Sequence, residues 1–240
     1  MSSGRTKHAV LRVGEELKVA ECGFATETEA KAVADWEKRH SGDINLMAQD
    51  AAEFAALASK RWHYYRRQAG IVSSVEELRQ RIAEDPKTEV AMMAVVRANW
   101  FQEPGVLGIC HFRRTWCNNL FVDFLTTHPE IASRSGTRVS GVGTWLLAIV
   151  AGVADEIEAP AIWGETTKRS AAFYKRTLDL QHETDEFRLP RRRYRAFLSE
   201  TRSKHTDELI AVNLKKIAEA GERGILPASW PSKPSGVFRR

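Results

Sequence analysis

Three segments dense in branched and aromatic residues follow one another between residues 89 and 127, and a helix that is apolar on nearly every side comes next. Their composition is typical of neighbouring strands, which we place at 89–97, 107–112 and 120–127. The helix is expected from Gly143 to about Glu158, and such a helix is typical of a protein interior. The chain is therefore expected to be an α/β protein built around a central sheet.

Start signals predict the helices that come before this region. In each signal, a side chain that accepts hydrogen bonds precedes a glutamate by three residues. The signals stand at Thr26–Glu29, Asp50–Glu53 and Ser74–Glu77, and they predict helices at 26–39, 50–68 and 75–83. Two shorter features accompany them, an alternating segment at 8–19 and a short strand expected at 44–47.

After the apolar helix, the pattern predicts a mixture of strands, helices and a tail. The expected elements are a strand at 161–167, a helix at 169–178, strand-like segments within 186–198 that are interrupted at Pro190, an amphipathic helix at 207–220 and a loose tail at 227–240.

Length and composition limit the class of protein. With 240 residues, of which 43% are hydrophobic and 28% charged, the chain is expected to hold one generous domain with appended segments. Its longest apolar run, 145–154, is about half of the roughly 20 residues that cross a bilayer. The polar N-terminus lacks the apolar stretch of a secretory signal. We therefore expect no membrane partner and a cytoplasmic location.

Cysteine content and charge narrow the chemistry further. The three cysteines have no zinc-binding spacing and are too few for a disulfide framework, so no metal is expected. A net charge of +5 and a pI near 9.2 permit an acidic partner without requiring one. The sequence contains neither a P-loop nor the elbow motif of serine hydrolases.

The segment Arg138–Thr144 carries the clearest functional signal. Two glycines with one residue between them, Gly141 and Gly143, stand at the start of the apolar helix and let its backbone approach a ligand closely. The first amides of a helix have no acceptor within it and lie at its positive end. This pattern favours a cradle for a pyrophosphate, with Arg138 adding a charged fork beside it. A plain glycine-rich loop between a strand and a helix remains the alternative.

Four blocks of the sequence, in order and spacing, resemble the GNAT N-acetyltransferases, which use acetyl-coenzyme A. The blocks are 125–129, 138–143, 161–167 and 170–175, and the resemblance covers roughly residues 43–199. It implies an α/β fold with a central mixed sheet, splayed strands and flanking helices. The implied domains are an N-terminal extension with a helix at 1–42, the acetyltransferase-like domain at 43–200, and a C-terminal helix and tail at 201–240.

The resemblance also implies roles for individual residues. Backbone groups of Leu125 and Thr127 would pair with the pantetheine arm, and amides at 139–144 would hold the pyrophosphate. Tyr174 matches a tyrosine that protonates the departing thiolate in many members. The implied cofactor-binding residues are Leu125, Thr127, Arg138, Val139, Ser140, Gly141, Val142, Gly143, Thr144, Thr167 and Ser170.

An amine acceptor is mostly protonated at neutral pH, so a base is expected near the thioester. Asp123 stands two residues before Leu125, and strand alternation would place both side chains on one face. Glu165 is the rival, because it shares a strand face with Thr167. Asp123, Glu165 and the absence of any dedicated base all stay open at this point.

Several of these residues also have a purely structural interpretation. Tyr174, beside an aromatic neighbour on a helix, can be a core residue. His128 is expected to be a loop residue at a strand end. Cys110 and His111 are adjacent in a strand and therefore expected to point to opposite faces, which disfavours a thiol nucleophile.

Two other functions compete with acetyl transfer to an amine acceptor. One is a GNAT-like protein that binds acyl-coenzyme A without catalysis. The other is a module directed at a nucleic acid or tRNA, suggested by aromatic and basic residues at 60–67 and 191–195. At 60–67, however, Trp62 and Tyr65 fall on the expected core stripe of a helix, which disfavours the nucleic-acid interpretation. The acceptor's identity and a homodimer are left open.

Overall fold

The computed structural model describes residues 7–40, 42, 44–102, 104–133 and 138–222, but not the side chains of 7, 211 and 214–222. Its elements run in the order β1 (Lys7–Val13), β2 (Glu16–Phe24), α1 (Glu27–His40), α2 (Leu46–Arg67), α3 (Val75–Glu84), β3 (Val90–Arg97), β4 (Val106–Arg114), β5 (Leu120–Thr127), α4 (Pro129–Ser133), β6 (Val139–Ser140), α5 (Val142–Glu156), β7 (Ala161–Glu165), α6 (Ala171–Thr177), β8 (Glu186–Pro190) and α7 (Arg191–Glu222).

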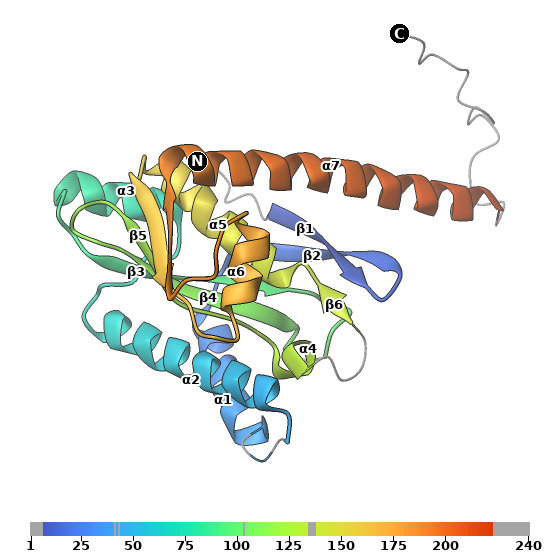
Figure 1. Cartoon of the computed structure of the whole chain (residues 1–240), viewed down its shortest axis with the longest axis horizontal. Coiled ribbons are helices and arrows are strands. Elements are labelled where there is room, and N and C mark those ends of the chain that lie inside the picture. Colours follow the sequence, from blue (N-terminus) through green and yellow to red (C-terminus); the bar gives the residue numbers. More distant parts are fainter. Residues whose placement is uncertain (1–6, 41, 43, 103, 134–137, 223–240) are drawn as a thin grey trace, which may run out of the picture.

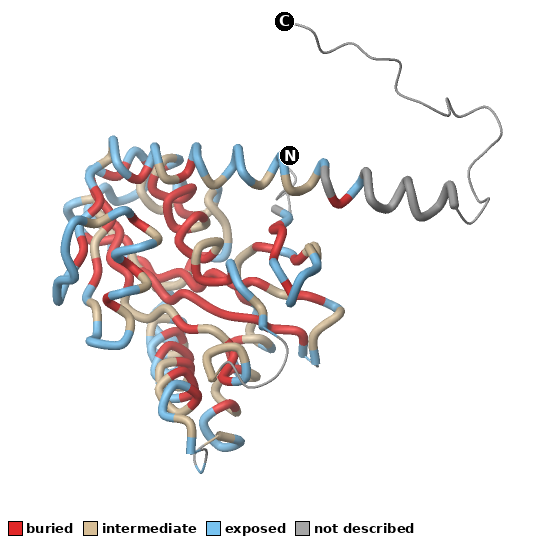
Figure 2. Tube along the Cα trace, turned by 45° about the vertical axis from the view of Figure 1, so that its right-hand side comes forward, coloured by how far each residue is buried: buried red, intermediate tan, exposed pale blue. Residues whose placement is uncertain are grey.

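One mixed sheet organises the molecule, with strand order β6-β1-β2-β3-β4-β5-β7-β8. Helices α1 and α2 cover one face, where Trp36 and Trp62 pack with Met93 and Val95. Helices α5, α6 and α7 lie on the opposite face (Figure 1), where α5 is buried along most of its length. Figure 2 shows that the centre of the sheet is buried, whereas α2 is buried along one side only. The expected mixed sheet with flanking helices is confirmed.

Two neighbouring strands of the sheet separate soon after they start. β5 and β7 are parallel and pair only where Leu120–Val122 face Ile162–Gly164. Beyond Val122, β5 continues to Thr127 beside β4 alone. The register between β4 and β5 shifts at the same point, because Val122 and Phe124 face consecutive residues of β4 and Asp123 is the extra residue of a bulge. A bulge bends a strand, and this one coincides with the separation from β7.

The N-terminal part of the chain differs from the expectations. The alternating segment at 8–19 forms most of the hairpin β1–β2, which belongs to the central sheet. The prediction of a short strand at 44–47 is wrong. Asn45 caps α2 there, because its side chain accepts from the amides of Met47 and Ala48. Asp50 therefore lies inside the helix it was expected to start. The helix starts expected at Thr26 and Ser74 are confirmed.

The C-terminal part is more helical than expected. Residues 191–198, expected to be strand-like, begin the 32-residue helix α7 directly after β8. Tyr194 anchors this helix, because its buried hydroxyl donates to the carbonyl oxygens of Ala154 and Ala159. The helix continues over α5 to β1 and extends past the sheet (Figure 1). The loose tail expected at 227–240 lies outside the described residues. Among the described residues, none of the helices has both the length and the apolar character needed to span a bilayer.

Candidate functional site

The start of α5 presents main-chain donors without acceptors. Gly141 caps the helix in the left-handed conformation, with φ of 99°, and supplies no side-chain hydrogen bond. The first amide bonded within the turn is that of Trp145, which donates to the Gly141 carbonyl oxygen at 3.0 Å. In the described part of the chain, no backbone acceptor is found for the amides of Val142, Gly143 and Thr144. These amides point out at the positive end of a buried helix.

Gly143 differs from its expected role. A Cβ at this position would lie 2.7 Å from Cζ of Phe173, which belongs to α6. The side-chain space at Gly143 is therefore filled by an aromatic ring of the protein and is not left for a ligand. The glycine allows α5 and α6 to pack closely, while its amide stays a free donor. Gly141, in contrast, is required by its positive φ.

A cleft of about 370 Å³ opens beside the start of α5. Gly141 and Thr144 line it, and three cationic side chains from β1, α6 and α7 surround it, namely Arg12, Arg176 and Lys204. No ion pair of these three cations is found among the described residues, although Glu200 and Glu208 line the same cleft. Cationic side chains and free amides together favour an anionic ligand at this end of α5.

The unpaired edge of β5 lies against the same helix start. Gly108 of β4 faces Thr127 of β5, and a Cβ on Gly108 would touch both a methyl group of Val142 and the carbonyl oxygen of Thr126. Leu125, in the part of β5 beyond its separation from β7, packs against the core on the α5 face. Because β7 has already turned away, an extended ligand can add itself to this edge as a strand would.

Tyr174 lies deep beneath this edge. Its ring stacks on Phe187 of β8 with centroids 4.6 Å apart, and the residue is 4% exposed. Burial, with a smaller contribution from the Cys110 thiol, raises the pKa of Tyr174 above its ordinary value. Its hydroxyl makes no hydrogen bond to any described residue. Its oxygen is not one of the fully buried polar atoms that lack a partner, so it keeps some contact with solvent.

Two residues that were expected to contact the cofactor, Thr167 and Ser170, form hydrogen bonds with each other. The Ser170 hydroxyl accepts from the amide of Thr167, and the Thr167 hydroxyl accepts from the amide of Ser170, at 2.8 and 3.2 Å. This reciprocal pair shapes the turn before α6. The other expected residues, Val139 and Ser140, form β6 and pair with β1, while exposed Arg138 accepts from the Gly14 amide through its carbonyl oxygen.

Asp123 does not lie as strand alternation predicted. The bulge turns its side chain to the α2 face, whereas Leu125 contacts the core on the α5 face. Its carboxylate bonds to Arg61, Arg113 and His111. Burial alone would raise the pKa of Asp123, but His111 and the two guanidinium groups outweigh it and lower the pKa. Asp123 is therefore a poor base.

Glu165 lies at the separation of β5 and β7, one residue beyond the last pair, Val122 and Gly164. It ends β7 on the same face as Trp163 and is exposed, and it has no ion pair among the described residues. The sequence analysis missed His111 as a partner of Asp123, because the two residues belong to different strands. The available signal was in β4, where His111 stands between the buried residues Cys110 and Phe112 and therefore points to the opposite face.

His128 lies between the end of β5 and α4, as expected for a loop residue at a strand end, and it is buried. Its ring lies 4.8 Å from that of Trp36 and 5.0 Å from that of Phe101, and its Nδ1 accepts from the amide of Glu130. Burial, together with the charges of His40 and Arg39, lowers the pKa of His128 to about 4. Cys110 and His111 lie on opposite faces, as expected.

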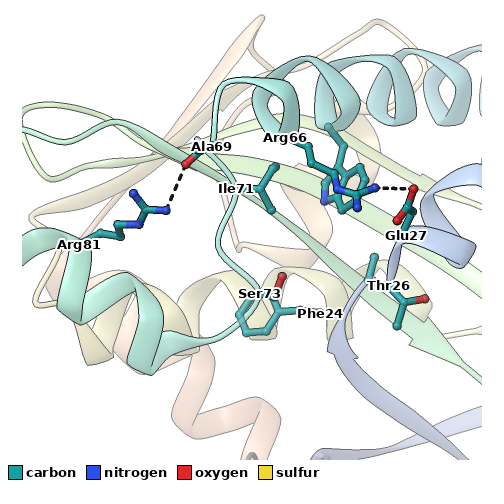
Figure 3. A pocket seen from close by; sticks show the side chains of 10 residues that line it. Phe24, Thr26, Glu27, Arg66, Ala69, Ile71, Ser73 and Arg81 are labelled. Atoms are coloured by element: carbon teal, nitrogen blue, oxygen red, sulfur yellow. Dashed lines mark hydrogen bonds and ion pairs between the residues drawn. The ribbon is translucent and has the colours of Figure 1, made fainter.

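A second hollow, of about 420 Å³, lies on the α2 face beside the end of β2 (Figure 3). Ile71 and Phe24 form apolar parts of its wall, and Arg66 is paired with Glu27 at one side. Arg81 on the other side donates to the carbonyl oxygen of Ala69. None of the residues expected to bind the cofactor lines this hollow.

No protein-family model and no curated protein sequence matches this chain. Among solved structures, a nourseothricin acetyltransferase is 22% identical, with a TM-score of 0.30, over 38% of this chain and 49% of its own. A putative streptothricin acetyltransferase from Bacillus anthracis, solved with acetyl coenzyme A, is 18% identical, with a TM-score of 0.30, over 42% and 63%. An acetyltransferase of the GNAT family from Staphylococcus aureus is 12% identical, with a TM-score of 0.39, over 65% and 81%. This chain thus spans about half the length of the first of these structures and less than two thirds of the length of the second.

Proposed function

We propose that this protein is an acetyltransferase that moves an acetyl group from acetyl-coenzyme A to an amine. The observation that carries the proposal is the combination of two kinds of unused main-chain groups in one place. The free amides of Val142–Thr144 lie next to the edge of β5 that β7 leaves. A ligand with a linked diphosphate and an extended amide-bearing arm fits both features.

The residues present fit such a cofactor at both ends. The amides of Val142, Gly143 and Thr144 donate to its phosphate oxygens, and Arg12 and Arg176 supply nearby positive charge. The edge of β5 from Leu125 to Thr127 bonds to the pantetheine arm. The bound cofactor supplies an acetyl group activated as a thioester.

Two side chains have positions suited to the proton transfers. Tyr174 holds its proton at neutral pH, because burial raises its pKa, and donates that proton to the thiolate as it leaves. Glu165 is the base, because the other carboxylate at the strand separation, Asp123, is engaged by two guanidinium groups. The amide near Leu125 donates to the carbonyl oxygen on which negative charge develops during attack.

Calorimetry with acetyl-coenzyme A, followed by a thiol-release assay with amine acceptors, tests the proposal. We expect saturable binding and release of free thiol that depends on the acceptor. Replacing Arg12 and Arg176 together by glutamine should weaken binding of the cofactor. As a control, Arg79→Gln removes a cation of α3 that pairs with Glu156 and does not line the cleft.

Three outcomes would overturn the proposal. Absence of binding would remove the cofactor site altogether. Binding without thiol release on any acceptor would instead support a protein that binds acyl-coenzyme A without catalysis. Cofactor binding that is unaffected in the double variant would place the cofactor elsewhere.

A further inference from the structure

We infer that the acceptor is an amino acid, whose carboxylate binds Arg61 and Arg113 and whose amine faces Glu165. This inference rests on the proposed acetyl transfer, because it concerns the second substrate of that reaction. It starts from a charged cluster on the α2 face of the sheet. The cluster consists of Arg61 from α2, His111 and Arg113 from β4, and Asp123 from β5.

The single carboxylate of the cluster is shared by three partners. Arg61 Nη2 and Arg113 Nε both donate to Oδ1 of Asp123, at 3.3 and 3.2 Å. His111 Nδ1 lies 3.2 Å from Oδ2. No second hydrogen-bond acceptor for either guanidinium group is found among the described residues. Each guanidinium group has five N–H donors, so most of the donors in the cluster are unused.

The charges of the cluster do not balance. Asp123 is ionised, because its partners lower its pKa, and it contributes one negative charge. Burial lowers the pKa of His111 and outweighs the opposing effect of Asp123, so the imidazole is neutral. The two guanidinium groups contribute two positive charges. The cluster therefore carries an excess of one positive charge, which a second carboxylate would neutralise.

One atom of the cluster also lacks a partner. His111 is completely buried, and its Nε2 atom has no hydrogen bond. Because Nδ1 donates to the carboxylate, Nε2 is left with its lone pair beside the rings of Tyr65 and Phe124. A network built only for stability would satisfy such an atom.

The cluster lies at the place where an acceptor meets the thioester. Asp123 is the bulged residue at which β5 separates from β7. Its side chain faces α2, so the cofactor on the α5 face and an acceptor on the α2 face approach the separation from opposite sides. Arg113 stacks over Phe121 at 4.8 Å, and Phe121 contacts Trp163 of β7 with centroids 4.2 Å apart. Phe121 is buried, and the partly exposed ring of Trp163 offers an apolar contact to the acceptor.

Glu165 supplies the complementary charge across the separation. Val122 faces Gly164, so Asp123 and Glu165 are the next residues on the two strands. Glu165 stands two residues after Trp163 in β7 and therefore lies on the same face of the sheet as Trp163 and the cluster. Its neighbour on β8 is Glu186, another carboxylate, and exposed Arg188 forms no ion pair with either. A negative site beside a positive one matches the amine and the carboxylate of an amino acid.

A thiol-release assay with matched acceptors tests this inference. The acceptors are phenylalanine and leucine, their C-terminal amides, and spermidine, each with saturating acetyl-coenzyme A. We expect kcat/KM for the amino acids to exceed that for their amides by about tenfold or more, as a charged hydrogen bond contributes. Arg61→Gln should raise KM for the amino acids by about tenfold, with little change for the amides.

Controls separate this inference from the proposed function. Arg67→Gln removes an exposed cation six residues further along α2 and should change neither KM. Calorimetry should give the same affinity for acetyl-coenzyme A in wild type and Arg61→Gln. If spermidine or the amides react as well as the amino acids, or if no amino acid reacts, the inference is overturned while the transferase can stand. If acetyl-coenzyme A does not bind at all, the proposed function itself fails.

Discussion

Phe173 fills the space into which a side chain at Gly143 would project, with its Cζ only 2.7 Å from the position of that Cβ. The contact joins α6 to the first turn of α5 and fixes Tyr174, the next residue, beneath the edge of β5. The glycine that resembles a cofactor-binding position therefore also sets the distance between two helices. Packing and ligand binding depend on the same residue.

Gly143→Val should destabilise the fold, not only the cofactor site. Real Cβ atoms essentially never come as close as 2.7 Å, so Phe173 or α6 must move. Overpacking of this kind costs about 1–3 kcal/mol, and urea unfolding monitored by circular dichroism measures it. Phe173→Leu in the valine background should recover part of the loss. A midpoint equal to that of wild type would show that the ring is not packed on Gly143.

Tyr174→Phe should lower turnover much more than stability. The hydroxyl makes no hydrogen bond to a described residue, so its removal costs the fold little, within about 1 kcal/mol. If the hydroxyl protonates the thiolate, kcat should fall by about 10²–10⁴-fold while affinity for acetyl-coenzyme A stays the same. Because burial raises the pKa of Tyr174, the wild-type rate should not fall through loss of this proton below pH 10. Equal turnover in the variant would make Tyr174 a core residue only.

Glu165→Gln and Asp123→Asn should have different effects. The first should lower kcat and leave stability nearly unchanged, because Glu165 is exposed. The second removes the negative charge that holds Arg61, Arg113 and His111 together, and should lower the free energy of unfolding by about 3 kcal/mol or more. Thermal unfolding and initial rates on the same samples distinguish them. Loss of activity without loss of stability in Asp123→Asn would restore Asp123 as the base.

Local signals predicted those parts of the fold that local contacts build. The amide of Glu29 donates to the Thr26 hydroxyl and the amide of Thr26 to the Glu29 carboxylate, as their spacing indicated. Asn45 and Asp50 are both good helix caps, and the local sequence does not indicate which of the two starts the helix. In the structure α2 starts at Leu46, because the Asn45 side chain accepts from the amides of Met47 and Ala48.

The candidate site was harder to predict, because its geometry depends on contacts between distant residues. The bulge at Asp123 is a property of the register with β4, and one extra residue was enough to move this side chain to the other face. The contact between Gly143 and Phe173 joins residues thirty positions apart. The order of motifs could locate the region of the site, but not which carboxylate faces the reacting atoms.

His128 should make the protein less stable as the pH falls. Its pKa is lowered to about 4 by burial and by His40 and Arg39, whereas in the unfolded chain it is near 6.5. A depressed pKa contributes stability that is fully present above pH 6.5 and is lost as the pH falls toward 4. The difference corresponds to about 3 kcal/mol between pH 8 and pH 4.

The variant His128→Asn isolates this contribution, because asparagine does not titrate and its Oδ1 can still accept from the amide of Glu130. The free energy of unfolding, measured in urea at pH 8 and at pH 4, should fall less in the variant by about that amount. Other buried histidines such as His111 titrate in both proteins and cancel in the comparison. Equal losses in the two proteins would mean that His128 is protonated in the folded state as readily as in the unfolded chain, and that its contacts with Trp36 and Phe101 do not exclude the charged form.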